Sequence, residues 1–227
     1  LNLLVASVMA LVVSMQIAQA TSVGSVSKIE LGAFGTPPNG ARIAKQLADI
    51  VVVNEALETV PNGSLSVDFI DNSNLVLGGG AKLIIDDMVY DSAKNQGSAI
   101  IKLTTGAFFW TSGKMNNMED IRIETPVATI GIRGTEFSIN IGPKGQTNVS
   151  VISGLVDLVS KKTNERIEIH PGFNADAGHE GDLSDLHSGI PNTGDKAINT
   201  QIVESAHNAL NRVKTQIKKQ TINKSGI

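Results

Sequence analysis

The residues best suited to bind a metal ion lie in one acidic stretch, residues 176–187. It supplies carboxylates and imidazoles, which are ligands that divalent ions take in proteins. Their spacing matches neither a calcium-binding loop nor a His-Glu-x-x-His helix, and ordering so flexible a stretch would cost conformational entropy. We therefore interpret it as a solvated linker and predict no metal and no cofactor. The candidate ligands are Asp176, His179, Glu180, Asp182, Asp185 and His187.

Arg133 is the second residue whose chemistry suits a ligand, because its guanidinium could hold a carboxylate through two hydrogen bonds. It lies between Gly131 and Gly134, in a sequence that favours a tight turn. The conventional interpretation is that Arg133 pairs within the protein, with Glu124, Glu136 or a carbonyl group, and holds that turn in place. We favour this structural role and keep ligand binding as the alternative.

No other pattern in the sequence predicts catalysis. A Gly-x-Ser-x-Gly nucleophile elbow is absent from the sequence. The run from Gly78 to Lys82 lacks the Gly-Lys-Ser/Thr ending of a phosphate-binding loop, so it predicts a turn between strands. The chain has no cysteine, which excludes disulfides, thiolate metal sites and a cysteine nucleophile. We predict that the protein is not an enzyme.

Composition narrows the classes of partner. The 227 residues carry a formal charge of only −3, which argues against a nucleic-acid footprint. Aromatic residues make up 4% of the chain, with Trp110 as the single tryptophan and Tyr90 as the single tyrosine. A stacking platform for bases or sugars is therefore not expected. We expect Trp110, with Phe108 and Phe109 beside it, to lie in the core or on a sheet surface.

The most specific pattern occupies residues 125–137 and reads Thr-Pro-Val-Ala-Thr-Ile-Gly-Ile-Arg-Gly-Thr-Glu-Phe. Proline suits only the first residue of a strand, an edge or a bulge, and glycine permits backbone angles that other residues avoid. With its flanking segments 65–78 and 149–158, this pattern resembles the FecR domain, the periplasmic part of iron-dicitrate-type signal transducers. The resemblance covers roughly residues 45–175. It marks as structural or interaction positions Thr125, Pro126, Gly131, Arg133, Gly134, Thr135 and Phe137.

The resemblance implies a non-enzymatic domain outside the cytosol that senses or binds a partner. In the transducers, a cytoplasmic anti-sigma segment and a membrane helix precede this domain, which contacts the signalling domain of an outer-membrane receptor. Here the domain follows residues 1–20 almost directly. We therefore do not expect the sigma-factor role itself to carry over.

The first residues predict export. Residues 3–13 are almost wholly apolar and are followed by Ala18-Gln19-Ala20, a small-x-small cleavage signature. We predict a signal peptide over residues 1–20, a mature chain that begins near Thr21, and a periplasmic or secreted bacterial protein. The alternative is an uncleaved membrane anchor, although the apolar run is shorter than the ~20 residues that a spanning helix needs.

The spacing of apolar residues predicts an all-β fold. Leu65, Val67 and Phe69 alternate with polar residues, and Gly, Asn and Asp punctuate a long series of similar short runs. This rhythm is typical of a two-sheet, jelly-roll-like sandwich or a short β-solenoid, and it does not choose between them. We expect Asp71 to cap one turn through its side chain. The segments are an N-terminal strand and loop at 21–44, a FecR-like β domain at 45–175, and a polar linker at 176–194.

The last segment, residues 195–221, predicts an amphipathic helix. Asp195 at its start and several lysines near its end complement the helix dipole. We expect the helix to dock on the protein's own sheet, with partner binding or dimerisation as the alternative. Apolar residues recur at three- and four-residue spacing: Ile198, Ile202, Ala206, Ala209, Leu210, Val213 and Ile217.

Together these observations favour a non-enzymatic exported module that contacts a protein or the cell envelope. The contact surface would be an open strand edge or the C-terminal helix. A regulatory subunit of trans-envelope, sigma-factor-type signalling is one alternative. Cell-wall or carbohydrate binding is another, against which the scarcity of aromatic rings weighs. We expect no nucleic-acid partner and no membrane span after signal cleavage.

Overall fold

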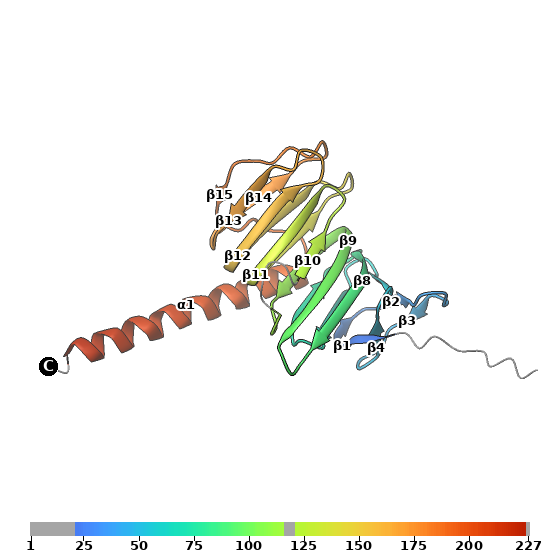
Figure 1. Cartoon of the computed structure of the whole chain (residues 1–227), viewed down its shortest axis with the longest axis horizontal. Helices are drawn as coiled ribbons and strands as arrows, with labels where there is room; N and C mark the ends of the chain where they lie inside the picture. Colours follow the sequence, from blue (N-terminus) through green and yellow to red (C-terminus); the bar gives the residue numbers. More distant parts are fainter. Residues whose placement is uncertain (1–20, 116–120, 226–227) are drawn as a thin grey trace, which may run out of the picture.

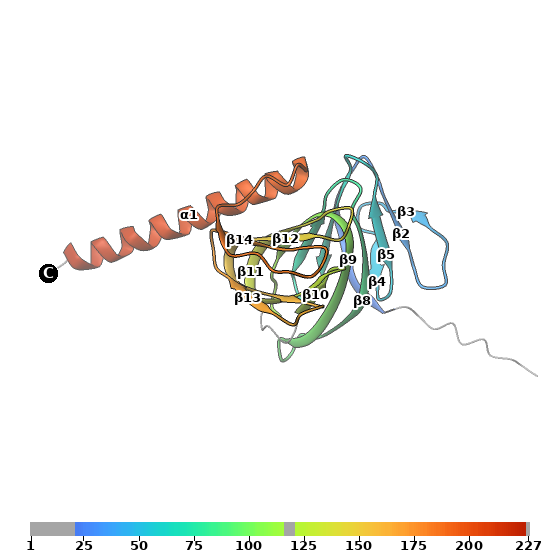
Figure 2. The ribbon, with the colours of Figure 1, turned by 90° about the horizontal axis from the view of Figure 1, so that it is seen from above.

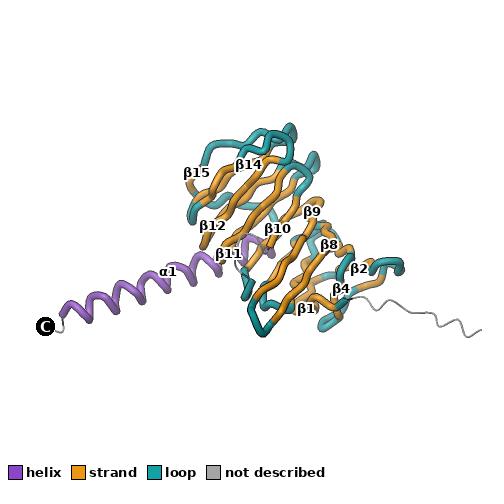
Figure 3. Tube along the Cα trace, in the orientation of Figure 1, coloured by secondary structure: helices purple, strands orange, loops and turns teal. Residues whose placement is uncertain are grey.

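The computed structural model describes residues 21–115 and 121–225, which form fifteen strands and one long helix (Figure 1). Strands make up the body, and the helix extends away from it (Figure 3). The predicted signal peptide lies outside the described residues. The elements are β1 (Ser22–Glu30), β2 (Ala33–Thr36), β3 (Ile43–Ala44), β4 (Ile50–Val52), β5 (Ala56–Thr59), β6 (Ser64–Phe69), β7 (Asn74–Leu77), β8 (Lys82–Asp91), β9 (Gln96–Thr111), β10 (Ile121–Glu124), β11 (Ala128–Ile141), β12 (Thr147–Ser160), β13 (Arg166–Ile169), β14 (Phe173–Ala177), β15 (His187–Ser188) and α1 (Lys196–Ser225).

The strands are hydrogen-bonded into one sheet that resolves into two layers, because three long strands change partners halfway along. The first half of β9 pairs with β8 and β10, and its second half pairs with β7 and β11. One layer runs β4-β1-β6-β7-β9-β11-β12-β14-β15, and the other runs β3-β2-β5-β8-β9-β10-β11-β12-β13. All described pairings are antiparallel except that of β9 with β10. Two layers of mainly antiparallel strands correspond to the sandwich, which is one of the two architectures that the sequence left open.

Glycines mark the places where the three long strands pass from one layer to the other. Gly106 in β9, Gly134 in β11 and Gly154 in β12 have φ of 104°, 56° and 80°. Residues with a Cβ rarely adopt such angles. Space is also limiting, because a Cβ at Gly106 would lie 2.6 Å from the Ala81 Cα and one at Gly154 would collide with the Gly134 carbonyl oxygen. Each long strand therefore turns its corner at a residue without a side chain.

Two apolar clusters result. The main core lies between the layers and contains the largest buried side chains, among them Phe108, Trp110 and Phe137. Because successive side chains of a strand point to opposite faces, Phe109 points outward between Phe108 and Trp110. It belongs to a second, smaller cluster that includes Ile198 of α1. The expectation that these three aromatic residues serve packing is confirmed.

The segments expected at the two ends of the β domain lie within the same sheet. In the stretch 21–44, β1 is hydrogen-bonded between β4 and β6. In the stretch 176–194, expected as a solvated linker, β15 pairs with β14, and the Asn174 side-chain amide donates to the carbonyls of His187 and Gly189. This stretch is held by strand pairing and side-chain hydrogen bonds, which its polar composition did not predict.

Candidate interaction surface

The first part of the family-like pattern builds the turn between β10 and β11. The Thr125 hydroxyl accepts a hydrogen bond from the Ala128 amide at 3.0 Å and another from the Thr147 hydroxyl at 3.0 Å. Thr125 is buried, so these bonds satisfy a hydroxyl that water does not reach. Pro126 packs so close to Gly145 that a Cβ there would lie 2.8 Å from the Pro126 ring. Thr125 and Pro126 thus have structural roles in this turn.

The middle of the pattern forms the corner of β11. Gly131 pairs in the ladder with Arg122 and has no positive φ, so only Gly134 needs the special backbone angle that we expected at both glycines. Arg133 is exposed and lies opposite Leu155 of β12. Of the carboxylates proposed as its partners, Glu124 pairs with Lys161 at 3.2 Å.

The end of the pattern fixes the corner to its neighbours. The Thr135 amide donates to the Ser112 hydroxyl at 3.0 Å, and the Ser112 amide donates back to the Thr135 carbonyl at 2.9 Å. Phe137 is fully buried in the main core. Between them, Glu136 points toward α1: its Oε2 accepts a hydrogen bond from the Ser205 hydroxyl and lies 3.4 Å from Arg212 Nη2. The corner therefore connects directly to the helix.

A second connection fixes the start of the helix. Asp195 Oδ1 accepts a hydrogen bond from the Ile198 amide at 3.0 Å, which is N-cap geometry. Asp195 Oδ2 accepts another from the Gly79 amide at 2.7 Å. A Cβ at Gly78 would lie 2.5 Å from the Asp195 carboxylate. The glycine run 78–80 is the predicted turn between β7 and β8. It also contacts Asp195, the residue that caps α1.

Between these two connections the helix covers an apolar patch on the outer face of one layer. The patch comes from β7, β9 and β12, and Ile198 is completely buried against it, with Ile202 partly buried. We call Ile198, Ile202, Ser205 and Ala209 the docked face, because they follow one another at four-, three- and four-residue spacing on the side that meets the sheet. The patch consists of Val76, Ala107, Phe109 and Ile152.

A different set of apolar residues on the same helix is left in solvent. Val203, Leu210 and Val213 are 67%, 50% and 51% exposed, and Ala206 is also exposed. We call these four residues the outer stripe. Each follows a residue of the docked side by one position, so the stripe is rotated about 100° from the docked face. Figures 1 and 2 show the helix leaving the body beyond its first turns.

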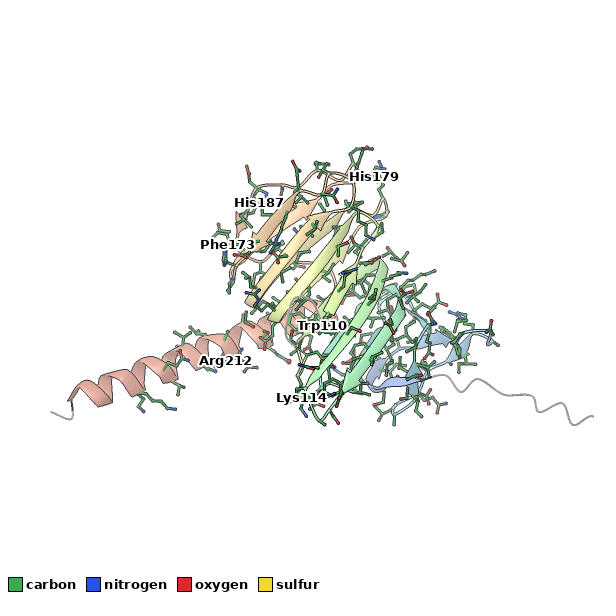
Figure 4. All side chains as sticks on the ribbon, viewed as in Figure 1. Trp110, Lys114, Phe173, His179, His187 and Arg212 are labelled. Carbon is green, nitrogen blue, oxygen red and sulfur yellow. The ribbon has the colours of Figure 1, made fainter. Side chains whose placement is uncertain are left out.

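The C-terminal half of the helix that carries the outer stripe is rich in cations. Lys214, Lys218 and Lys219 are exposed, and none of them forms an ion pair within residues 21–115 and 121–225. From Ser205 to Ser225 the helix contains no carboxylate. In contrast, Arg212 reaches back to Glu136 from a position near the middle of the helix (Figure 4). The exposed apolar residues therefore lie on a helix whose C-terminal half is positively charged.

The acidic stretch 176–187 does not assemble a metal site in the described part of the chain, where no group of three or more His, Asp or Glu side chains converges. His179 and His187 lie apart in Figure 4. His179 Nδ1 lies 2.6 Å from the Lys144 carbonyl oxygen, and Asp176 Oδ1 accepts a hydrogen bond from the side-chain amide of Asn148. These side chains support the local loop structure.

The open strand edges offer less surface than the helix. The terminal strands of the two layers, β3, β4, β13 and β15, have between two and four residues each. Strands this short present few unpaired backbone groups to an incoming chain. Arg166 and Glu168 place charges on β13, which further disfavours strand addition. Of the two contact surfaces expected from the sequence, the helix therefore offers an incoming protein more surface than the strand edges do.

Asp71 fulfils the capping role predicted for it. Its Oδ1 accepts hydrogen bonds from the amide and the hydroxyl of Ser73, at 3.0 and 2.5 Å. Its Oδ2 accepts from the Met115 amide at 3.3 Å, and its carbonyl from the Lys114 amide at 2.8 Å. Asp71 is fully buried, and one carboxylate thus holds two loops together.

Comparison with known proteins identifies the family of the central segment. Residues 55–157 match the family model described as FecR protein, which confirms the resemblance over that range. No curated protein sequence matches the chain. Among the described residues, no helix combines the length and apolar character needed to cross a bilayer.

Solved structures share only part of the architecture. Two crystal structures of a proposed anti-sigma factor from Parabacteroides distasonis ATCC 8503 superpose with a TM-score of 0.47 and 14% identity, and the match covers 59% of this chain and 59% of theirs. A structure described as a cell surface anchoring domain gives a TM-score of 0.27 at 24% identity and covers 27% of this chain and 82% of its own. At these scores neither likeness supports an argument about function.

Proposed function

We propose that this chain, whose residues 55–157 are a FecR segment, is a non-enzymatic regulatory module that is exported to the cell envelope and acts by contacting a protein partner. The proposal is supported by the two different faces of α1. One face of the helix is anchored to the β body, and another presents Val203, Leu210 and Val213 to solvent. An exposed apolar stripe on a rigid element is a common protein-binding surface.

The contacts at the start of the helix support this role. Asp195, Ile198 and Ser205 fix the helix to the turn 78–80, to the apolar patch and to Glu136. The outer stripe is thus presented in one orientation, which reduces the entropy lost when a partner binds. An anchored helix with a second, exposed apolar face favours contact with a partner as the function of this surface.

In-cell photo-crosslinking tests the proposal. The photoreactive amino acid p-benzoylphenylalanine would replace Leu210 in the full chain, Asn211 as a control elsewhere on the helix surface, and Ile43 on edge strand β3. We expect a discrete cross-linked envelope protein from position 210 and none from position 211. A discrete product from position 43 alone would move the contact to the sheet edge. No product from positions 210 or 43 would refute an interaction module.

A regulatory subunit of trans-envelope, sigma-factor-type signalling is the second candidate, favoured by the FecR match at residues 55–157. It requires that the partner of α1 be a signalling component. Transcription from promoters of an extracytoplasmic sigma factor would then change when the outer stripe is made polar. Unchanged transcription, with the cross-link at position 210 intact, would separate contact from this form of signalling.

A further inference from the structure

The outer stripe has the spacing of a coiled-coil seam. Val203, Ala206, Leu210 and Val213 follow at three-, four- and three-residue intervals, and the sequence continues this spacing at Ile217. Alternating three- and four-residue steps give the 3.5-residue repeat that lets two helices keep one seam in contact. A seam of this kind is narrow, whereas a helix that lies on a core or in a lipid interface needs a broader apolar face.

Charge distinguishes the helix from the rest of the chain. Residues 196–225 contain six Lys or Arg residues and one Glu, a formal charge of +5. The remainder of a chain with net charge −3 therefore carries −8. Beside the seam, Lys214 directly follows Val213 and occupies the flanking position at which coiled-coil partners exchange ion pairs. A partner helix with glutamates on its flanks would meet this cation and the positive charge of the helix as a whole.

We propose that the outer stripe binds an acidic amphipathic helix of another protein and forms a two-stranded coiled coil with it. This inference rests on the proposed function and names the chemistry of its partner. Apolar side chains of the partner pack against Val203, Leu210 and Val213. Its flanking carboxylates pair with Lys214, and Lys218 and Lys219 add positive charge at the same end of the helix.

A second copy of this chain fits the stripe less well. Two such helices would bring their lysines close together, with no carboxylate between Ser205 and Ser225 to neutralise them. Like charges along a helix pair are destabilising. A lipid surface also fits less well, because α1 contains no Trp, Phe or Tyr, the residues that anchor many interfacial helices. An acidic helix satisfies both the seam and the charge.

Titration of the full chain with a designed peptide tests the inference. The probe is a fluorescent four-heptad peptide with Val and Leu at its seam positions and Glu at its flanking positions. The control peptide has Lys at the same flanking positions. We expect saturable binding of the Glu peptide that weakens as NaCl is added, and at least about tenfold weaker binding of the Lys peptide. Equal binding of both peptides, or no binding of either, would overturn the inference.

Paired variants locate the binding on the stripe. Leu210→Gln with Val213→Gln makes the seam polar without changing charge, and Asn208→Gln with Asn211→Gln makes matched neutral changes on another exposed face. We expect the first pair to weaken Glu-peptide binding at least about tenfold and the second to leave it unchanged. Circular dichroism establishes that both variants fold. Equal losses in the two variants would place the binding elsewhere and contradict the inference.

Two further measurements cover the other occupants. In sedimentation equilibrium we expect the chain alone to be monomeric, and a dimer that Leu210→Gln with Val213→Gln abolishes would assign the stripe to a second copy. In flotation with phosphatidylglycerol–phosphatidylethanolamine vesicles we expect no stripe-dependent binding, and such binding would assign it to a membrane. A cross-link at position 210 without Glu-peptide binding would overturn this inference and leave the proposed function intact. The absence of a cross-link from both position 210 and position 43 would instead overturn the proposed function.

Discussion

The two parts of α1 differ in what their apolar residues do, although the helix is continuous. In residues 196–212, Ile198 and Ile202 pack against the sheet, and Arg212 is the last side chain paired with the body among those that the structure describes. Beyond Arg212, the helix continues to Ser225 without the sheet beneath it (Figure 2). One continuous helix thus carries two apolar faces, one packed on its own sheet and one exposed to solvent.

A rotation of one residue separates these two roles. The docked face and the outer stripe run in parallel because each outer residue directly follows a residue on the docked side, as Leu210 follows Ala209. Mutations can therefore address one set without disturbing the other.

Truncating the docked face should have the largest effect. Ile198→Ala removes a fully buried side chain from the patch under the helix, and large-to-small changes of this kind cost about 2–4 kcal/mol. We expect amides of residues 199–212 to lose that much protection in hydrogen exchange. Val203→Ala is the control, because its side chain is 67% exposed and should change protection by less than about 0.5 kcal/mol. Similar losses in both variants would remove the distinction between the two faces.

Removing the helix cap should have the next largest effect. Asp195→Ala eliminates the hydrogen bonds from the Ile198 and Gly79 amides, and we expect a loss of about 1–2 kcal/mol in the same exchange measurement. Asp195→Asn keeps an acceptor oxygen and should recover most of the loss. If Asn behaves like Ala, the charge of Asp195 rather than its hydrogen bonds holds the helix start.

Neutralising Glu136 should have a smaller effect. Glu136→Gln keeps an oxygen that can accept from the Ser205 hydroxyl but loses the charge that faces Arg212. Arg212 is largely exposed, so we expect a loss of less than about 1 kcal/mol. Urea unfolding at low and high NaCl should show a small salt dependence in the parent that disappears in the variant. A salt response that is the same in both would mean that this pair contributes nothing measurable.

Changing the outer stripe should have the smallest effect on stability. Leu210→Gln with Val213→Gln replaces exposed side chains, so we expect urea unfolding within about 0.5 kcal/mol of the parent. The same variant should lose the binding of the Glu peptide. A large loss of stability would show that these residues contact the body in solution, and the division of the helix would then be incorrect.

Much of the fold follows from local patterns. Alternation such as that of Leu65, Val67 and Phe69 indicates strands, and the side chains of this run are buried in β6 as expected. The helix expected at 195–221 is observed at Lys196–Ser225, with Asp195 as its cap. These features were predictable because the pattern and the capping residue lie within a few positions of each other.

The arrangement of the layers and the site was not predictable in the same way. Alternation tells which residues of β9 share a face, but not that this strand pairs with β8 along one half and β7 along the other. The bond from Gly79 to Asp195 joins residues 116 positions apart, and that of Ser205 with Glu136 spans 69. No local signal marks such pairs. The outer stripe could have been recognised by separating the three- and four-residue series that begins at Val203 from the one that begins at Ile198.

The anchoring of α1 at one end gives it the mechanical character of a lever. The thirteen residues beyond Arg212 extend about 20 Å at the usual rise per residue. A tilt of about 10° at the Asp195–Arg212 anchor would therefore carry the tip by about 3.5 Å. Because Glu136 belongs to the same corner as Gly134, a small change in the bend of β11 would produce a larger displacement at the far end of the helix. Conversely, a force applied to that end would be transmitted to the corner of β11.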